Sequence, residues 1–161
     1  MALNKTEILA AIVASLRERL RKNRDVAQHA IASATHEEAR AEDKYDTRGL
    51  EMTYLAAGAA DRIEDLRMTL GQYEFWRLPP ANPDAIRPGA LVSLRADDGR
   101  EKAVFVAPFG DGEQLEVAGQ TIAVVTLRAP LGRALVGAAE GDEVKIALAG
   151  GTVLWSVEGV Q

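Results

Sequence analysis

Apolar positions along the first half of the chain recur at steps that alternate between three and four residues. Such steps place apolar side chains along one stripe of a helix that pairs with a second helix. The first series consists of Leu9, Val13, Leu16, Leu20, Ala27, Ala30 and Ala34, with Asn23 filling its one gap; the second consists of Leu50, Tyr54 and Ala57 and, after one slip, Ile63, Leu66, Leu70 and Tyr73. The pattern predicts an antiparallel two-helix coiled-coil hairpin over residues 1–78, with arms of roughly 30 residues.

The second half changes to short apolar runs separated by turn residues, which is typical of β-strands. Dipeptides such as Asp98-Gly99 and Gly150-Gly151 separate these runs. Pro130 and Gly137 suit the first turn and the end of a short helix. The predicted strands cover residues 90–96, 102–108, 120–127, 143–149 and 152–157. We therefore expect a small antiparallel sheet with one short helix packed on it, and an α+β fold class for the whole chain.

The composition shifts at Pro79. All six prolines and eleven of the fourteen glycines lie from that residue onward. Residues 79–89 are rich in proline and polar side chains, which is typical of a linker. The sequence thus predicts a helical hairpin over residues 1–78, a linker over 79–89 and a β-rich domain over 90–161.

The formal net charge is −5, divided into −1 for residues 1–78 (12 basic, 13 acidic) and −4 for residues 79–161 (7 basic, 11 acidic). Neither part is basic, which argues against tight nonspecific binding to duplex DNA. The chain has no cysteine, which excludes disulfides and thiolate metal sites and fits a reducing compartment. It shows no signal-peptide pattern and no apolar run long enough to span a membrane. We expect a cytoplasmic protein with no membrane association.

Three arginines, Arg17, Arg21 and Arg24, fall along one stripe of the first predicted helix. One interpretation is a solvated face, which is the commonest role of such a stripe. The other is a weak contact with RNA phosphates or with an acidic protein surface.

Three acidic residues, Glu42, Asp43 and Asp46, lie where the first predicted helix gives way to the second, near residues 42–47. In one interpretation Asp46 or Thr47 caps the second helix, and the acids complement the dipole at its start. In the other, carboxylates at the end of a rod reach into the cleft of another protein and supply oxygen ligands to Mg²⁺. One or two such ligands are enough where an enzyme supplies the rest of the metal site.

The order of these features resembles that of the Gre-type transcript-cleavage factors of bacterial RNA polymerase. The most specific stretch is PLGRALVGAAEGDEVKI (Pro130–Ile146), which is similar to the family pattern Ser-Pro-(Leu/Ile)-Gly-Arg-Ala-Leu-(Ile/Leu)-Gly followed by Gly-Asp-Glu-Val. The stretches AADRIEDLRMTL (Ala59–Leu70) and PGALVSLRADDG (Pro88–Gly99) are similar to the family's return helix and to the opening of its C-terminal domain. The resemblance covers nearly the whole chain and implies an FKBP-like fold for residues 90–161.

The resemblance also implies a partner and a docking site. Such factors are monomers that dock their C-terminal domain at the rim of the secondary channel of bacterial RNA polymerase. That role falls here on Pro130, Leu131 and Gly132. The resemblance implies that the chain is not itself an enzyme and that it carries no cofactor when free.

The resemblance implies that Asp43 and Asp46, with Glu42 as an alternate, are the carboxylates that act at the tip of the rod. In the family the rod enters the channel, and its tip carboxylates help hold a catalytic Mg²⁺ and a water. The polymerase itself then hydrolyses backtracked RNA near the nascent 3′ end. Asp43 and Asp46 would share this Mg²⁺ site only in the complex.

Two departures from the family pattern leave alternatives open. The family's tip reads Asp-x-x-Glu-Asn, whereas this chain has DKYDT (Asp43–Thr47), so Asp46 is one methylene shorter than the family's Glu and Thr47 replaces the Asn. The second departure is Ala129, which stands where Ser is common in the family. A cleavage-deficient channel regulator, either DksA-like or inhibitory, is the second hypothesis. The third is a structural coiled-coil homodimer with a peptide-binding module, whose groove only Trp155, Phe105 and Phe109 would line.

Overall fold

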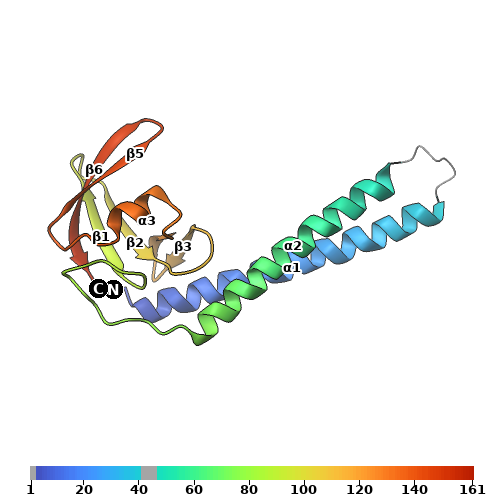
Figure 1. Cartoon of the computed structure of the whole chain (residues 1–161), viewed down its shortest axis with the longest axis horizontal. Helices are drawn as coiled ribbons and strands as arrows, with labels where there is room; N and C mark the ends of the chain where they lie inside the picture. The colour runs from blue at the N-terminus through green and yellow to red at the C-terminus, as the bar shows by residue number, and fades with distance from the viewer. Residues whose placement is uncertain (1–2, 41–46) are drawn as a thin grey trace. The chain divides into compact units, whose positions relative to one another are not determined.

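The computed structural model describes residues 3–40 and 47–161, which form two compact units. The hairpin unit, Val13–Phe75, contains most of helix α1 (Lys5–Arg40) and all of helix α2 (Arg48–Phe75). The sheet unit comprises Met1–Ile12 and Trp76–Gln161. Figure 1 shows α1 and α2 running alongside each other, and a sheet with one short helix. The predicted α+β class, a helical hairpin followed by a β-rich domain, is confirmed.

Burial along α1 follows the predicted coiled-coil seam over its middle. Leu16, Leu20 and Ala30 are buried, and Asn23 and Ala27 between them are half-buried. The seam differs at the start of the helix, where Ile8 and Ile12 are buried and the predicted Leu9 and Val13 are half-buried. Residues up to Ile12 belong to the sheet unit, so the burial of their side chains does not have to follow the seam of the hairpin.

The predicted seam on α2 is confirmed from Ile63 to Tyr73 and wrong before it. Leu50 and Tyr54 are 53% and 69% exposed, and Ala57 is exposed as well. The positions that are buried or half-buried with heptad spacing are Gly49, Met52, Ala56, Ala59, Ile63, Leu66, Leu70 and Tyr73. These steps alternate between three and four without a slip, as one continuous heptad pattern requires. Small residues therefore close the seam toward the tip, and the larger side chains turn outward.

The sheet has six strands in the order β3-β4-β2-β1-β6-β5 (Figure 1). Their bounds are β1 Leu91–Ala96, β2 Glu101–Val106, β3 Glu113–Val117, β4 Gln120–Val125, β5 Glu143–Leu148 and β6 Gly151–Val160. β3 was not predicted from the sequence, because it is a short edge strand in which the exposed Gln114 and Glu116 alternate with Leu115 and Val117. β3 reverses the chain direction once more, so β4 pairs parallel with β2. The prediction of an entirely antiparallel sheet is therefore wrong for this one pair.

Helix α3 (Pro130–Leu135) packs on one face of the sheet, where the main hydrophobic cluster lies. Leu135 of α3 is fully buried in that cluster together with Val92, Val104 and Trp155. The strand alternation turns Phe105 to the opposite face, and it is also fully buried there. Leu91, paired with Phe105, is buried on that face too, whereas Ser93 and Arg95 further along β1 are exposed on it, so only one end of this face is covered.

The proline-rich segment 79–89 is part of the sheet unit rather than a free spacer. Ile86 is fully buried, its backbone N–H donates to Ala138 O at 2.8 Å, and its carbonyl accepts from Gly137 N at 2.9 Å. Gly89, at φ +96°, lies so close to Pro79 that a Cβ there would be 2.4 Å from the proline Cδ. Lys5 Nζ donates to Pro79 O at 3.0 Å, and burial lowers the pKa of that lysine. Proline-rich composition predicts an extended chain but does not reveal this packing.

None of the helices in the described residues combines the length and the apolar character that crossing a membrane requires.

Candidate functional site

The residues proposed for docking, Pro130, Leu131 and Gly132, form the start of α3, directly after the loop that joins β4 to this helix. Thr126 is buried, and its carbonyl accepts a hydrogen bond from Ala129 N at 3.0 Å, which closes a tight turn. Arg133 N then donates to Ala129 O at 3.0 Å, and the helix begins. Pro130 occupies the first helical turn, where the missing N–H of proline costs nothing. The turn and the helix start therefore form one continuous, hydrogen-bonded unit.

Gly132 holds this unit together by a close backbone approach. It is buried, and a Cβ on it would lie 2.0 Å from Thr126 O and 2.7 Å from the Thr126 carbonyl carbon. No other residue type fits such an approach without a shift of the backbone. Gly132, one of the three predicted docking residues, therefore has a structural role in this turn and presents no side chain to a partner.

The other members of the predicted docking set differ in their exposure. Pro130 is exposed, whereas Leu131 is half-buried against the main hydrophobic cluster. Two further side chains, Leu127 and Arg128, are exposed in the same turn, and Arg133 Nη1 donates to Arg128 O at 2.7 Å. The sequence analysis missed Leu127 because it followed a strand-like run and was assigned to the strand. No local pattern in the sequence marks it, because its exposure depends on the turn closed at Thr126.

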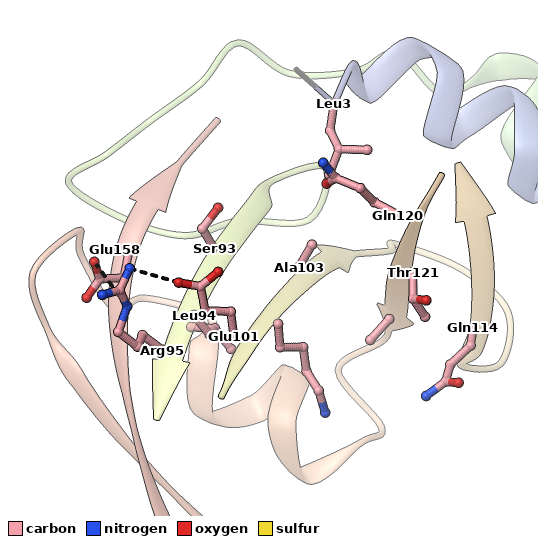
Figure 2. A pocket seen from close by; sticks show the side chains of 12 residues that line it. Leu3, Ser93, Leu94, Arg95, Glu101, Ala103, Gln114, Gln120, Thr121 and Glu158 are labelled. Carbon is pink, nitrogen blue, oxygen red and sulfur yellow. Dashed lines mark ion pairs between the residues drawn. The ribbon is translucent and has the colours of Figure 1, made fainter. Parts of the chain in front are cut away.

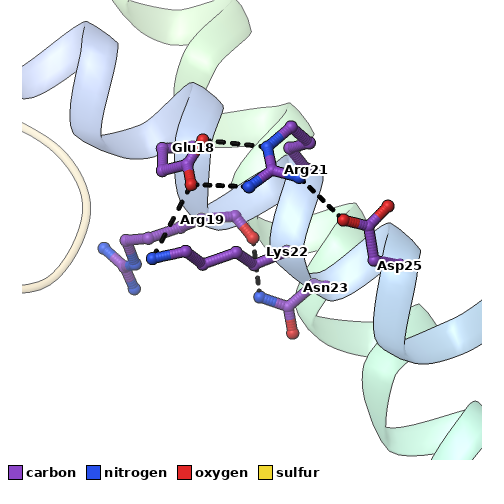
Figure 3. Close-up of polar contacts among 6 residues, drawn as sticks. All are labelled: Glu18, Arg19, Arg21, Lys22, Asn23 and Asp25. Carbon is purple, nitrogen blue, oxygen red and sulfur yellow. Dashed lines mark hydrogen bonds and ion pairs between the residues drawn. The ribbon is translucent and has the colours of Figure 1, made fainter.

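The arginine stripe of α1 is partly neutralised by acids on the same helix (Figure 3). Arg21 Nε and Nη2 donate to Glu18 at 3.0 and 2.8 Å, and Arg21 Nη1 donates to Asp25 at 2.8 Å. The hydrogen bond from Arg21 is the main reason why the pKa of Glu18 lies below its ordinary value. Arg21 therefore has less charge to offer an RNA phosphate than Arg17 and Arg24, which are exposed on the same helix.

Asn23, the polar position in the α1 seam, makes a local contact. Its Nδ2 donates to Arg19 O at 2.8 Å, within the same helix (Figure 3). This bond satisfies the amide of a half-buried side chain inside the seam.

The acidic tip residues Glu42, Asp43 and Asp46 lie outside the described residues. Their proposed metal and catalytic roles therefore stay predictions from the sequence. Within residues 3–40 and 47–161, no group of three or more His, Asp or Glu side chains is gathered closely enough to hold a metal ion.

The half of the hairpin nearer the tip carries an unusual density of outward apolar side chains. Val26, Ile31, Leu50, Tyr54 and Leu55 are all between 43% and 69% exposed. An open groove of about 440 Å³ lies among them, and its lining includes Val26, His29, Ala30, Met52 and Leu55. The groove follows from the small residues of the seam, which leave space between the two helices.

A second groove, of about 460 Å³, lies on the sheet (Figure 2). Ser93, Arg95 and Ala103 contribute to its lining from the central strands, and Leu3 lies at its rim beside Gln120. Arg95 pairs with Glu101 at 2.9 Å and lies 3.9 Å from Glu158, so much of its charge is balanced within the groove. This groove was not predictable from local sequence patterns, because its lining comes from separate strands and from the segment before α1.

The aromatic residues considered for a peptide groove serve the interior of the sheet unit instead. Phe105 is fully buried and Trp155 is 5% exposed. Phe109 is half-buried and meets Trp76 edge to face at 6.4 Å between ring centroids. The peptide-binding hypothesis therefore loses the side chains on which it depended.

No protein-family model matches the chain, and no curated protein matches its sequence. Among solved structures it is similar to the GreA factor homolog 1 (Gfh1) protein of Thermus thermophilus, at 22% identity and a TM-score of 0.40 over 92% of this chain and 94% of that one. It is also similar to Thermus aquaticus Gfh1, at 23% identity and a TM-score of 0.42 over 92% of each chain. A third likeness is to the prokaryotic transcription elongation factor GreA/GreB from Nitrosomonas europaea, at 20% identity and a TM-score of 0.39 over 81% of this chain and 93% of that one. Values of this size assign no activity, so a function has to be argued from the residues of this chain.

Proposed function

We propose that the chain is a secondary-channel factor of bacterial RNA polymerase, which stimulates the polymerase to cleave backtracked transcripts and so promotes elongation. The observation that carries the proposal is the stretch Pro130–Ile146, which is similar to the Gre-type pattern over most of its length and has Val136 where the pattern has Ile or Leu. Within it, Gly132 packs against Thr126 at a distance that only glycine allows, so the motif has a structural reason in this chain. A long helical hairpin with an acidic tip sequence precedes it in the order that the family shows.

In this proposal the factor acts as a cytoplasmic monomer and performs no reaction by itself. The sheet unit binds the polymerase through the loop that contains Pro130 and Leu131, and the hairpin enters the channel. Asp43 and Asp46, with Glu42 as an alternate, are the residues that would hold a Mg²⁺ ion shared with the polymerase. That ion would stabilise the attacking and leaving oxygens of RNA hydrolysis.

The Arg17 and Arg24 side chains have a secondary place in this proposal. Both are exposed on α1, and a guanidinium group suits contact with an RNA phosphate or an acidic wall of the channel. Arg21 contributes less because Glu18 and Asp25 already pair with it.

A cleavage-deficient channel regulator is the second candidate, and one observation favours it. Asp46 and Thr47 stand where the family pattern has Glu and Asn. The carboxylate of Asp46 reaches one methylene less far than a glutamate, and metal ligation tolerates little error in position. In this version the chain binds the polymerase and alters initiation or pausing without transcript cleavage.

The deciding experiment is RNA cleavage in a stalled, backtracked elongation complex supplied with Mg²⁺. Wild-type protein is compared with Asp43→Ala/Asp46→Ala and with a matched control, Asp61→Ala/Asp65→Ala, which removes two exposed carboxylates from α2. We expect shortened RNA with wild type and the control and not with the tip variant. Binding of each variant to the polymerase is measured separately. Intact binding with no shortening by wild type would refute cleavage and leave the regulator; absence of binding would refute both.

A further inference from the structure

The sheet unit exposes one large apolar side chain among its described residues, that of Leu127, which is 47% exposed. The other exposed large apolar side chains of the described chain all lie in the hairpin unit. A single exposed leucine is common on protein surfaces and carries no meaning alone. The exposed residues beside Leu127 are the reason to assign a role to its side chain.

Leu127 is exposed beside Arg128 and Pro130, its near neighbours in the chain, and beside Arg133, which is also exposed and donates from Nη1 to Arg128 O at 2.7 Å; these four residues are called the patch. An apolar centre with a polar or charged rim is the usual composition of a protein-binding surface, and arginine is enriched there. The patch brings two positive charges together in a part of the chain, residues 79–161, whose net charge is −4. This local reversal of sign favours an acidic partner surface.

The patch is also held in one conformation. The carbonyl of Thr126, the residue before Leu127, accepts from Ala129 N and lies against Gly132. The Arg133 side chain ties down the next carbonyl along, that of Arg128, at 2.7 Å. A surface that is fixed before binding loses less conformational entropy when a partner arrives.

We propose that Leu127 anchors the chain to its partner and that Arg128 and Arg133 select an acidic, apolar protein surface on the polymerase. This inference rests on the proposed function and adds these residues to the docking loop. Nucleic acid is the weaker candidate for the same patch. Two guanidinium groups in an acidic unit neutralise few phosphates, and affinity for nucleic acid rises with the number neutralised.

The test is the affinity of the full chain for purified bacterial RNA polymerase, measured by titration with a fluorescent label. We expect Leu127→Ser to weaken binding by about tenfold or more, since truncation at the centre of an interface has effects of that size. Arg128→Gln should weaken binding severalfold at low salt, and the difference should shrink as salt is added. Arg95→Gln is the matched control, because it removes one exposed arginine from the opposite face of the sheet, and it should bind as wild type does.

Several outcomes would overturn the inference, and they are distinguishable. If wild type binds and both Leu127→Ser and a size-conserving Leu127→Gln bind equally well, the inference fails while the proposed function stands. If wild type does not bind the polymerase, the proposed function fails and takes the inference with it. Binding of wild type to single-stranded RNA, lost in Arg128→Gln, would assign the patch to nucleic acid instead. Urea midpoints equal to wild type for the Leu127 variants would show that weakened binding is not a folding defect.

Discussion

Replacing Gly132 by alanine tests the close approach on which the α3 loop depends. The added Cβ would lie 2.0 Å from Thr126 O, far inside van der Waals contact, and its neighbour is backbone rather than a flexible side chain. The Thr126 carbonyl must then move, which also weakens the bond it accepts from Ala129 N at 3.0 Å. Inserting a methyl group into a packed site typically costs about 1–3 kcal/mol, and a weakened hydrogen bond adds about 1 kcal/mol.

One effect of the same substitution acts in the opposite direction. Alanine is favoured over glycine inside a helix by about 1 kcal/mol, and Gly132 lies in α3. The steric cost exceeds this gain, so we expect a net loss of about 2 kcal/mol, or a fall in melting temperature of about 10 °C for a unit of this size.

Urea denaturation followed by tryptophan fluorescence measures this loss directly. The chain has two tryptophans, Trp76 and Trp155, and both belong to the sheet unit. The matched control is Gly71→Ala, because Gly71 lies within α2 and a Cβ there would meet no atom within 4 Å. Circular dichroism should show the hairpin stabilised by about 1 kcal/mol in that variant. An unchanged or raised urea midpoint for Gly132→Ala would refute the packing argument.

Three further predictions concern other positions. Ala129 has the extended backbone of an N-cap (φ −77°, ψ 145°) but no side chain that can cap the helix. Ala129→Ser should therefore raise the stability of the sheet unit by about 0.5–1 kcal/mol, measured as a higher urea midpoint. No gain, or the same gain with Ala129→Val, would argue against capping. Ala59 is fully buried, whereas Ala57 is exposed. Ala59→Asp should therefore lower the free energy of unfolding of the hairpin by about 3 kcal/mol, and Ala57→Asp by less than about 0.5 kcal/mol, in thermal melts followed by circular dichroism. The reverse order would support the seam phase predicted from the sequence. Hydrogen bonds from the backbone and then the side chain of Arg100 lower the pKa of Asp98 in the folded state. The stability that this carboxylate contributes is therefore complete above the ordinary aspartate pKa of about 3.9 and is lost as the pH falls through the lower folded pKa. Asp98→Asn should remove that part of the acid dependence of the urea midpoint, and an unchanged acid dependence would contradict the prediction.

The hairpin shows which part of a coiled-coil seam a sequence determines. Between Ile63 and Tyr73 large apolar residues occupy the seam, and the predicted phase is confirmed. Toward the tip the seam is made of Gly49, Met52, Ala56 and Ala59, three of which are small, while larger residues such as Leu50 and Tyr54 are exposed. Hydrophobicity alone therefore predicts the wrong stripe of α2 toward the tip. The heptad spacing that holds between Ile63 and Tyr73 continues there, although the seam residues are mostly small.

The sheet shows a different limit. Strands with clear alternation were predicted, but β3 was missed because it is short, lies at an edge and alternates with acids. That omission also concealed the parallel pairing of β2 with β4, since each strand reverses the chain. Pairing between strands is non-local, and no single segment records it.

The predicted docking residues were grouped by a sequence motif, and their docking role stays a prediction. The sequence identified Pro130, Leu131 and Gly132 as one group, and the structure separates their parts: an exposed ring, a half-buried side chain and a backbone contact. Exposure of Leu127 depends on the turn closed at Thr126, which only three-dimensional geometry reveals. The roles of the tip carboxylates stay predictions.

The position of β6 in the sheet has a consequence for synthesis of the chain on the ribosome. β6 lies between β1 and β5, and Leu91 exchanges two backbone hydrogen bonds of 2.9 Å with Gln161. The sheet therefore cannot close until residue 161 has left the ribosomal exit tunnel, whereas the hairpin is translated in full before β1 begins. Domains fold as their residues emerge, so the hairpin is able to fold before the sheet is complete. A nascent chain that stops short of β6 carries the acidic tip sequence without a finished sheet.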